Sequence, residues 1–148
     1  MTIMIEYDKY KKALKNLELQ FANYRALDPA LSGLMREAVE ESVIHRFEIC
    51  YDCLWKVLKR YLSENLGLPD LPNSPKPIFR IAAENHILTA STPSDPLPIE
   101  RWMDYANARV DTTHDYNGLK AKAALALIQD FIPDATALYQ KMTSQPWK

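Results

Sequence analysis

The segment RVDTTHDY, residues 109–116, holds three side chains that together suit chemistry on a phosphate group. Arg109 offers a planar guanidinium that can hold two phosphate oxygens, and histidine, here His114, exchanges protons near neutral pH. Tyr116 follows two residues later and adds a phenol hydroxyl. Because an arginine and a proton-transferring histidine suit metal-free cleavage of a phosphodiester, Arg109 and His114 are the candidate catalytic residues.

The backbone of this segment limits how these side chains can meet. Five residues of regular helix rotate His114 by about 140° from Arg109. Residues 111–113 are poor in a helix interior and Asn117-Gly118 is a turn signal, so we expect the helix to end between the two. The two side chains reach one site either because the helix ends between them or because a second subunit contributes one of them. The alternative is an ordinary helix end, with a capping arginine and a turn histidine.

Cys50 and Cys53 form a second pattern that could carry chemistry, a C-x-x-C motif. The pair falls inside a predicted helix rather than at a helix N-terminus, where a thiolate would be stabilised, so a redox role is disfavoured. A zinc site needs two further ligands, and His45, His86 and His114 lack the spacing to supply them. We therefore expect no metal and no cofactor. Two cysteines are too few for a disulfide framework, which fits a reducing compartment.

Apolar residues recur every three or four positions, which predicts helices throughout. We expect helices from Asp8, a plausible N-cap, to about residue 28, from about 34 to 65, from Ser74-Pro75 to about 88, from about Ile99, and across 124–142 with a kink at Pro133. The longest apolar stripe belongs to the second helix and includes Val43, Phe47, Cys50, Leu54 and Val57. No alternating run of strand length appears. The predicted fold is all-α, an up-and-down four-helix bundle with a short additional helix.

The second predicted helix carries another seam beside its apolar stripe. Glu48, Asp52, Trp55 and Lys59 follow the helical period on one face. This face is either solvated or a contact surface for a partner or a second subunit, since a tryptophan among charges is a frequent interface anchor.

The size and net charge of the chain limit how it can be organised and what it can bind. A chain of 148 residues with 47% apolar composition fits a single domain, residues 1–148. The formal net charge of -1 gives no global positive field, so any RNA contact must be local. No stretch approaches the roughly 20 apolar residues of a membrane span, and the first residues lack the features of a signal peptide. We expect a cytoplasmic protein with no membrane association.

The spacing R-x4-H-x-Y at residues 109–116 resembles the signature of the HEPN (higher eukaryotes and prokaryotes nucleotide-binding) superfamily. A second pattern, RFE-x2-Y-x3-WK-x2-K within residues 41–62, is similar to a helix of its nucleotidyltransferase substrate-binding branch. This second pattern comprises Arg46, Phe47, Glu48, Tyr51, Trp55, Lys56 and Lys59. The resemblance covers about residues 7–142 and includes the short helix after SPKPIF.

This resemblance implies a homodimeric four-helix bundle that pairs with a minimal nucleotidyltransferase. Several such pairs are toxin-antitoxin systems in which the HEPN member is an RNase, with two R-x4-H motifs meeting at the dimer interface. In some, the partner transfers AMP to the tyrosine of the motif and silences the RNase. By position, Arg109 would hold the scissile phosphate of RNA, His114 would transfer protons and Tyr116 would accept AMP.

Three functions remain open from the sequence. Relatives with this motif often have asparagine directly after the arginine, where this chain has Val110, so one polar contact to a substrate is missing. Val110 and the near-neutral charge favour a non-catalytic subunit that binds a substrate or nucleotide for the nucleotidyltransferase. The intact Arg109, His114 and Tyr116 favour an RNase. The third possibility is a helical adaptor that only binds a partner protein.

Overall fold

The computed structural model describes residues 5–88, 98–114 and 118–148, with Thr113, His114 and Gly118 described by their backbone alone. Its helices are α1 (Asp8–Arg25), α2 (Gly33–Glu64), α3 (Pro75–Glu84), α4 (Pro98–His114) and α5 (Gly118–Thr143). No strand occurs in these ranges. The prediction of an all-α bundle with a short additional helix is confirmed.

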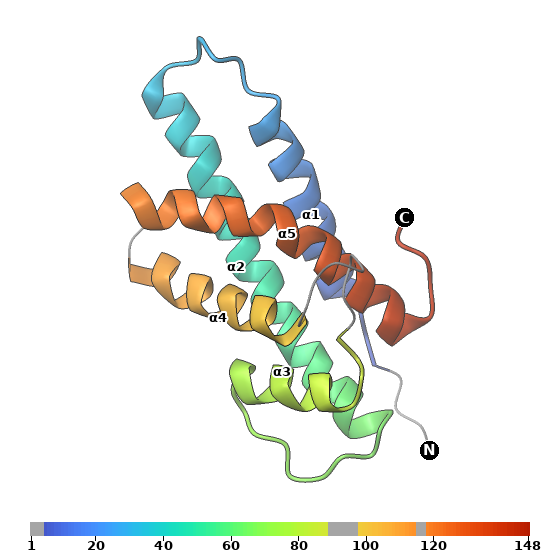
Figure 1. The fold of residues 1–148 in the computed structure, drawn as a ribbon. Helices are drawn as coiled ribbons and strands as arrows, with labels where there is room; N and C mark the ends of the chain where they lie inside the picture. Colours follow the sequence, from blue (N-terminus) through green and yellow to red (C-terminus); the bar gives the residue numbers. More distant parts are fainter. Residues whose placement is uncertain (1–4, 89–97, 115–117) are drawn as a thin grey trace.

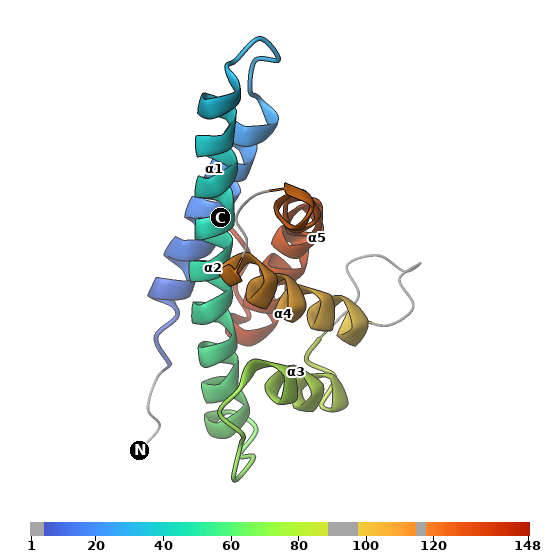
Figure 2. The ribbon, with the colours of Figure 1, turned by 90° about the vertical axis from the view of Figure 1, so that its left-hand side faces the viewer.

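The helices form two antiparallel hairpins, α1–α2 and α4–α5 (Figure 1). The α4–α5 hairpin crosses α2 instead of running along it, and α3 lies near the C-terminal end of α2. Figure 2 shows α3, α4 and α5 to one side of the α1–α2 hairpin. The long helix α2 contacts each of the other helices, so it is the element against which the remaining side chains are positioned.

Two of the predicted helix starts included an N-cap residue. Ser74 is the N-cap of α3 and Pro75 occupies its first turn, as predicted, because proline needs no hydrogen-bond acceptor there. The N-cap of α1 is Tyr7, so the prediction of Asp8 was wrong by one position. Asp8 instead lies in the first turn of α1, where its negative charge favours the positive end of the helix dipole.

The helix α3 ends four residues before the predicted position near Leu88. The side chain and the backbone N–H of Asn85 both donate to the Ile81 carbonyl, at 2.8 Å and 3.1 Å. His86 then has a φ of 59°, a left-handed conformation that stops the helix. At the other end of the chain, α5 continues through Pro133.

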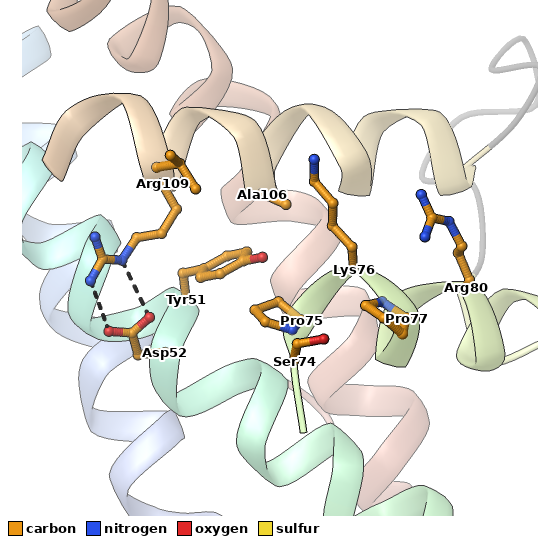
Figure 3. A pocket seen from close by; sticks show the side chains of 10 residues that line it. Tyr51, Asp52, Ser74, Pro75, Lys76, Pro77, Arg80, Ala106 and Arg109 are labelled. Atoms are coloured by element: carbon orange, nitrogen blue, oxygen red, sulfur yellow. Dashed lines mark hydrogen bonds and ion pairs between the residues drawn. The ribbon is translucent and has the colours of Figure 1, made fainter. Parts of the chain in front are cut away.

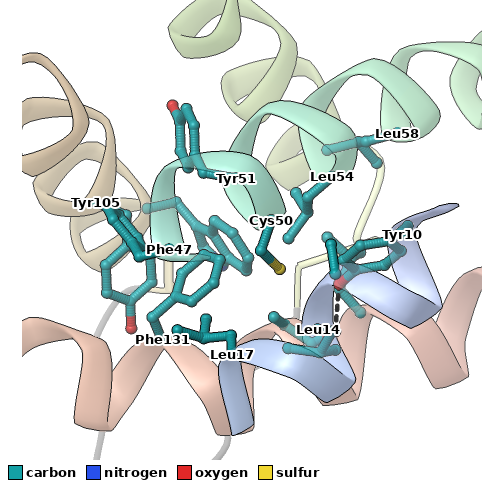
Figure 4. Packing of buried hydrophobic residues seen from close by; sticks show 14 of the residues in the cluster. Tyr10, Leu14, Leu17, Phe47, Cys50, Tyr51, Leu54, Leu58, Tyr105 and Phe131 are labelled. Carbon is teal, nitrogen blue, oxygen red and sulfur yellow. Dashed lines mark hydrogen bonds between the residues drawn. The ribbon is translucent and has the colours of Figure 1, made fainter. Parts of the chain in front are cut away.

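The core is built from the predicted apolar stripes and is rich in aromatic rings (Figure 4). Phe131 of α5 makes edge-to-face contacts with Phe47 of α2 at 5.0 Å and with Tyr105 of α4 at 5.1 Å between ring centroids. Trp102 of α4 stacks on Phe79 of α3 at 4.9 Å. These contacts fix α4 against α2 and α3, and so determine which side chains of α2 face Arg109.

A buried polar cluster joins α4 to α5. Asp134 is 2% exposed and accepts a hydrogen bond from Tyr105 Oη at 2.6 Å. It also forms an ion pair with Arg101. Burial and the hydrogen bond to Asp134 raise the pKa of Tyr105, so its phenol stays a donor. This cluster holds α4 and α5 together, while the C-terminal part of α4 contacts α2.

Candidate functional site

Arg109 lies on α4 and reaches across to two carboxylates on α2, Glu48 and Asp52, of which Figure 3 shows Asp52. Its Nη1 donates to Glu48 Oε2 at 2.9 Å. Its Nε and Nη2 donate to the two carboxylate oxygens of Asp52, at 3.3 Å and 3.1 Å. This forked pairing uses the geometry that distinguishes arginine from lysine, so the guanidinium is firmly oriented.

Glu48 is the buried member of this cluster. It is 7% exposed, and its Oε2 also accepts a hydrogen bond from Thr112 Oγ1 at 3.2 Å. A buried carboxylate is tolerated when it is paired with a cation and hydrogen-bonded, and Arg109 and Thr112 meet both conditions. Glu48 therefore ties the C-terminal half of α4 to α2.

The four residues of the predicted seam do not share one outward face. Glu48 and Asp52 contact Arg109 of the same chain, and Glu48 is buried, contrary to its assignment to a solvated or partner-binding face. Trp55 is half-buried and packs against the core. Lys59 donates to Asn73 Oδ1 at 3.3 Å. A role of Trp55 and Lys59 in contacting a partner stays a prediction.

The predicted helix break between Arg109 and His114 was wrong, because α4 continues to His114. Thr112, expected to favour a helix end, is fully buried, and its hydroxyl also bonds the Arg109 carbonyl at 3.2 Å. Tertiary contacts thus outweigh its weak helix propensity. The backbone of His114 therefore lies about 140° around α4 from Arg109. The side chain of His114 and all of Tyr116 lie outside the described residues.

A cavity of about 550 Å³ opens beside Arg109, between α2, α3 and α4. Its cations are Lys76, Arg80 and Arg109, and its acid is Asp52. Figure 3 shows the side chains of Lys76 and Arg80 extending from α3 toward α4. The rest of the lining is Tyr51, Ser74, Pro75, Pro77, Ala106 and Val110. The cavity therefore combines an apolar floor with a surplus of positive charge.

Tyr51 stands out among the residues that line this cavity. It is 1% exposed, and its hydroxyl has no hydrogen-bond partner among the described residues. Burial and the nearby Asp52 raise the pKa of Tyr51, with Arg109 opposing, so the phenol keeps its proton. An unsatisfied buried hydroxyl costs about 1–3 kcal/mol, so its position needs an explanation.

Neither cysteine of the C-x-x-C motif is placed for redox chemistry. Cys50 is buried in the core, and burial raises the pKa of its thiol well above the usual value. Burial also raises the pKa of Cys53, which is half-buried. Among the described side chains, no three ligating residues of histidine, cysteine or carboxylate type lie close enough together to hold a metal ion.

These thiols give a direct test of burial. We expect Cys50 to resist alkylation by iodoacetamide at about pH 8 and Cys53 to react more slowly than free cysteine, because a raised pKa lowers the thiolate fraction. Mass spectrometry of the labelled protein gives the rate at each site. In denaturant both thiols should react at the rate of free cysteine. Rapid labelling of Cys50 in the folded protein would contradict its place in the core.

The chain and its fold are similar to known proteins. The family model described as nucleotidyltransferase substrate binding protein like matches residues 5–144, so the chain belongs to that family, within the HEPN-like helical superfamily. The fold is also similar to the crystal structure of a protein from Thermus thermophilus. The TM-score is 0.71 and the identity 24%, over 90% of this chain and 98% of that one. None of the curated proteins compared with the chain matches it.

Within the described ranges, no helix has both the length and the apolar character needed to cross a bilayer.

Proposed function

We propose that the chain works with a minimal nucleotidyltransferase in a pair of the toxin-antitoxin type, as a homodimer that cleaves RNA without a metal ion. The family supports the partnership, since its description refers to a nucleotidyltransferase. Arg109 would contact the scissile phosphate, and His114 would move a proton from the attacking 2′-hydroxyl to the leaving 5′-oxygen. Tyr116 would accept AMP from the partner, which would silence the RNase.

The observation that carries this proposal is the unbroken course of α4 from Arg109 to His114. Within one subunit these positions diverge by about 140° around the helix. In a symmetric dimer, each His114 can face the Arg109 of the other subunit, so two sites form at one interface. Val110 within this segment is 57% exposed, and Leu119 at the start of α5 is 85% exposed. Their exposure supports an interface at this end of the α4–α5 hairpin.

The ion pairs of Arg109 favour a second candidate function. With Glu48 and Asp52 both bound, the positive charge of Arg109 is already compensated, so a phosphate must displace at least one carboxylate. Asp52 is the replaceable partner, because its side chain is 42% exposed whereas that of Glu48 is 9% exposed. If Asp52 stays in place, the chain is a subunit that binds a substrate or nucleotide for the nucleotidyltransferase without cleaving RNA.

Mixing two inactive variants tests the shared site. Arg109→Gln and His114→Ala should each abolish cleavage of an unstructured RNA, because each removes one half of every site. After exchange of subunits, about half of the dimers should be mixed and contain one intact site, which gives roughly a quarter of the wild-type sites. Cleavage of a fluorescent RNA measures this recovery.

The matched control is a mixture of Arg109→Gln with itself, treated identically. Circular dichroism and light scattering should show that both variants remain helical and dimeric. Absence of recovery from well-folded mixed dimers would contradict a site shared between subunits. A wild-type chain that binds its nucleotidyltransferase but never cleaves RNA would favour the binding subunit instead.

A further inference from the structure

We propose that the cavity between α2, α3 and α4 binds a small molecule with a phosphate group and a flat apolar body, the chemistry of a nucleoside monophosphate. The site adjoins the proposed RNA-cleaving centre, because Arg109 borders both and Val110 lines the cavity next to the proposed dimer interface. The inference rests on the proposed function only in taking the ligand as a nucleotide. The binding itself requires neither cleavage nor a nucleotidyltransferase.

Two cations on α3 provide the phosphate contact. Lys76 and Arg80 are four residues apart, so they lie on the same face of the helix, and both extend into the space below α4 (Figure 3). Neither forms an ion pair with any residue in the described ranges. Like charges at this spacing repel each other. An anion between them removes this repulsion and can accept hydrogen bonds from both side chains.

The start of α3 adds to the positive potential at the same place. Ser74 is the N-cap, yet its side chain makes no capping hydrogen bond. Pro75 and Pro77 have no backbone N–H, so Lys76 has the one backbone N–H among the first three residues of the helix. The helix dipole and this amide both favour an anion. Ser74, Lys76 and Arg80 thus form a phosphate subsite at one end of the cavity.

Tyr51 is an independent sign of a ligand. The residue is 1% exposed, and its hydroxyl has no partner among the described residues. In Figure 3 the ring lies between Arg109 and Pro75, and its hydroxyl points into the space shared by Ala106 and Lys76. A ligand that fills this space can accept a hydrogen bond from this phenol.

The remaining walls suit a flat apolar group. Pro75, Ala106 and Val110 present apolar surface along the cavity, beside the ring of Tyr51. A volume of about 550 Å³ lies within the range of sites for small organic molecules. A purine base placed on this surface would leave its phosphate within reach of Lys76 and Arg80.

Titration calorimetry with AMP and the chain alone tests this site. We expect saturable binding of one AMP per subunit, weakened at least about tenfold by replacing both Lys76 and Arg80 with alanine, because charge-assisted contacts are lost. The matched control is Lys56→Ala, an exposed lysine that lines a smaller cavity of about 340 Å³ between α1 and α2. Its AMP affinity should equal that of the wild type.

Tyr51→Phe gives a second, independent measurement. This change should weaken AMP binding several-fold while leaving the thermal midpoint unchanged or higher, because the hydroxyl it removes has no partner among the described residues of the free protein. A purely structural tyrosine would show the opposite pattern, with a lower midpoint and unchanged affinity.

Two probe molecules separate the parts of the ligand. Adenosine lacks the phosphate and inorganic phosphate lacks the base, so both should bind at least about tenfold more weakly than AMP. Phosphate that binds as tightly as AMP would overturn the apolar part of the site. Absence of saturable AMP binding, or equal losses in Lys56→Ala and the Lys76/Arg80 variant, would overturn the whole proposal. Neither result depends on whether the chain cleaves RNA.

Discussion

Replacing Arg109 with alanine is expected to lower the free energy of unfolding by about 3 kcal/mol, because the buried Glu48 carboxylate loses its ion pair with Arg109. Thr112 would remain a hydrogen-bond donor to that carboxylate, but its hydroxyl carries no charge to replace that of the guanidinium. For a chain of this size the loss corresponds to roughly 10 °C in the thermal midpoint. Thermal and urea unfolding, followed by circular dichroism, measure the change.

A matched control comes from an exposed ion pair within α2. Arg60 and Glu64 form an exposed pair at a four-residue spacing, so Arg60→Ala should change the free energy of unfolding by no more than about 0.5 kcal/mol. Adding Glu48→Gln to Arg109→Ala should recover part of the lost stability, because this second change removes the charge of the buried carboxylate. If Arg109→Ala is as mild as Arg60→Ala, the assigned role of the Glu48 ion pair is wrong.

The expected loss of stability would also lower any activity measured for Arg109 variants. Because Arg109 stabilises the contact between α4 and α2, its replacement can lower RNA cleavage through partial unfolding as well as through loss of a phosphate contact. Asp52→Asn separates the two effects. It leaves Glu48 paired and makes Arg109 easier for phosphate to reach, so RNA affinity should rise several-fold with little change in the thermal midpoint.

Replacing Tyr116 with phenylalanine should leave RNA cleavage intact while removing its inhibition by the nucleotidyltransferase. AMP attached to Tyr116 would add a negative phosphate near Arg109, where it competes with the phosphate of RNA for the same guanidinium. Treatment with the partner, ATP and magnesium should therefore reduce cleavage by the wild type to background. The Phe variant should be insensitive to the same treatment.

The control for this prediction is treatment without ATP, which should inhibit neither protein. Equal inhibition of both proteins in the presence of ATP would show that silencing does not require Tyr116. Binding of the nucleotidyltransferase itself would then account for the inhibition.

The helices could be predicted from the sequence because their signals are local. Apolar spacing marked the buried stripes, and Ser74-Pro75 marked the start of α3. The end of α4 could not be predicted from propensity, since Thr112 is buried against Glu48 from a distant part of the chain. The orientation of the Glu48 side chain could not be predicted for the same reason. Helical periodicity places it beside the apolar stripe, and only the packing of α4 shows that it faces Arg109.

The cavity was also missed, because its walls come from three helices that no local pattern connects. The run SPKPIFR did contain a signal, namely two cations four residues apart at a proline-started helix. Recognising it as a site required the position of Tyr51, whose buried hydroxyl is unsatisfied among the described residues. Arg109, by contrast, was identified from its motif, and the structure places it at the edge of that cavity.

Intact-mass spectrometry tests the central claim, that the chain is a nucleotidyltransferase partner with its functional centre at Arg109, His114 and Tyr116. The purified chain is incubated with its nucleotidyltransferase, ATP and magnesium, and its mass is compared with that of Tyr116→Phe treated in the same way. We expect a mass gain equal to one or more AMP groups on the wild type and none on the variant. No gain with an enzyme shown to be active, or the same gain on both proteins, would contradict it.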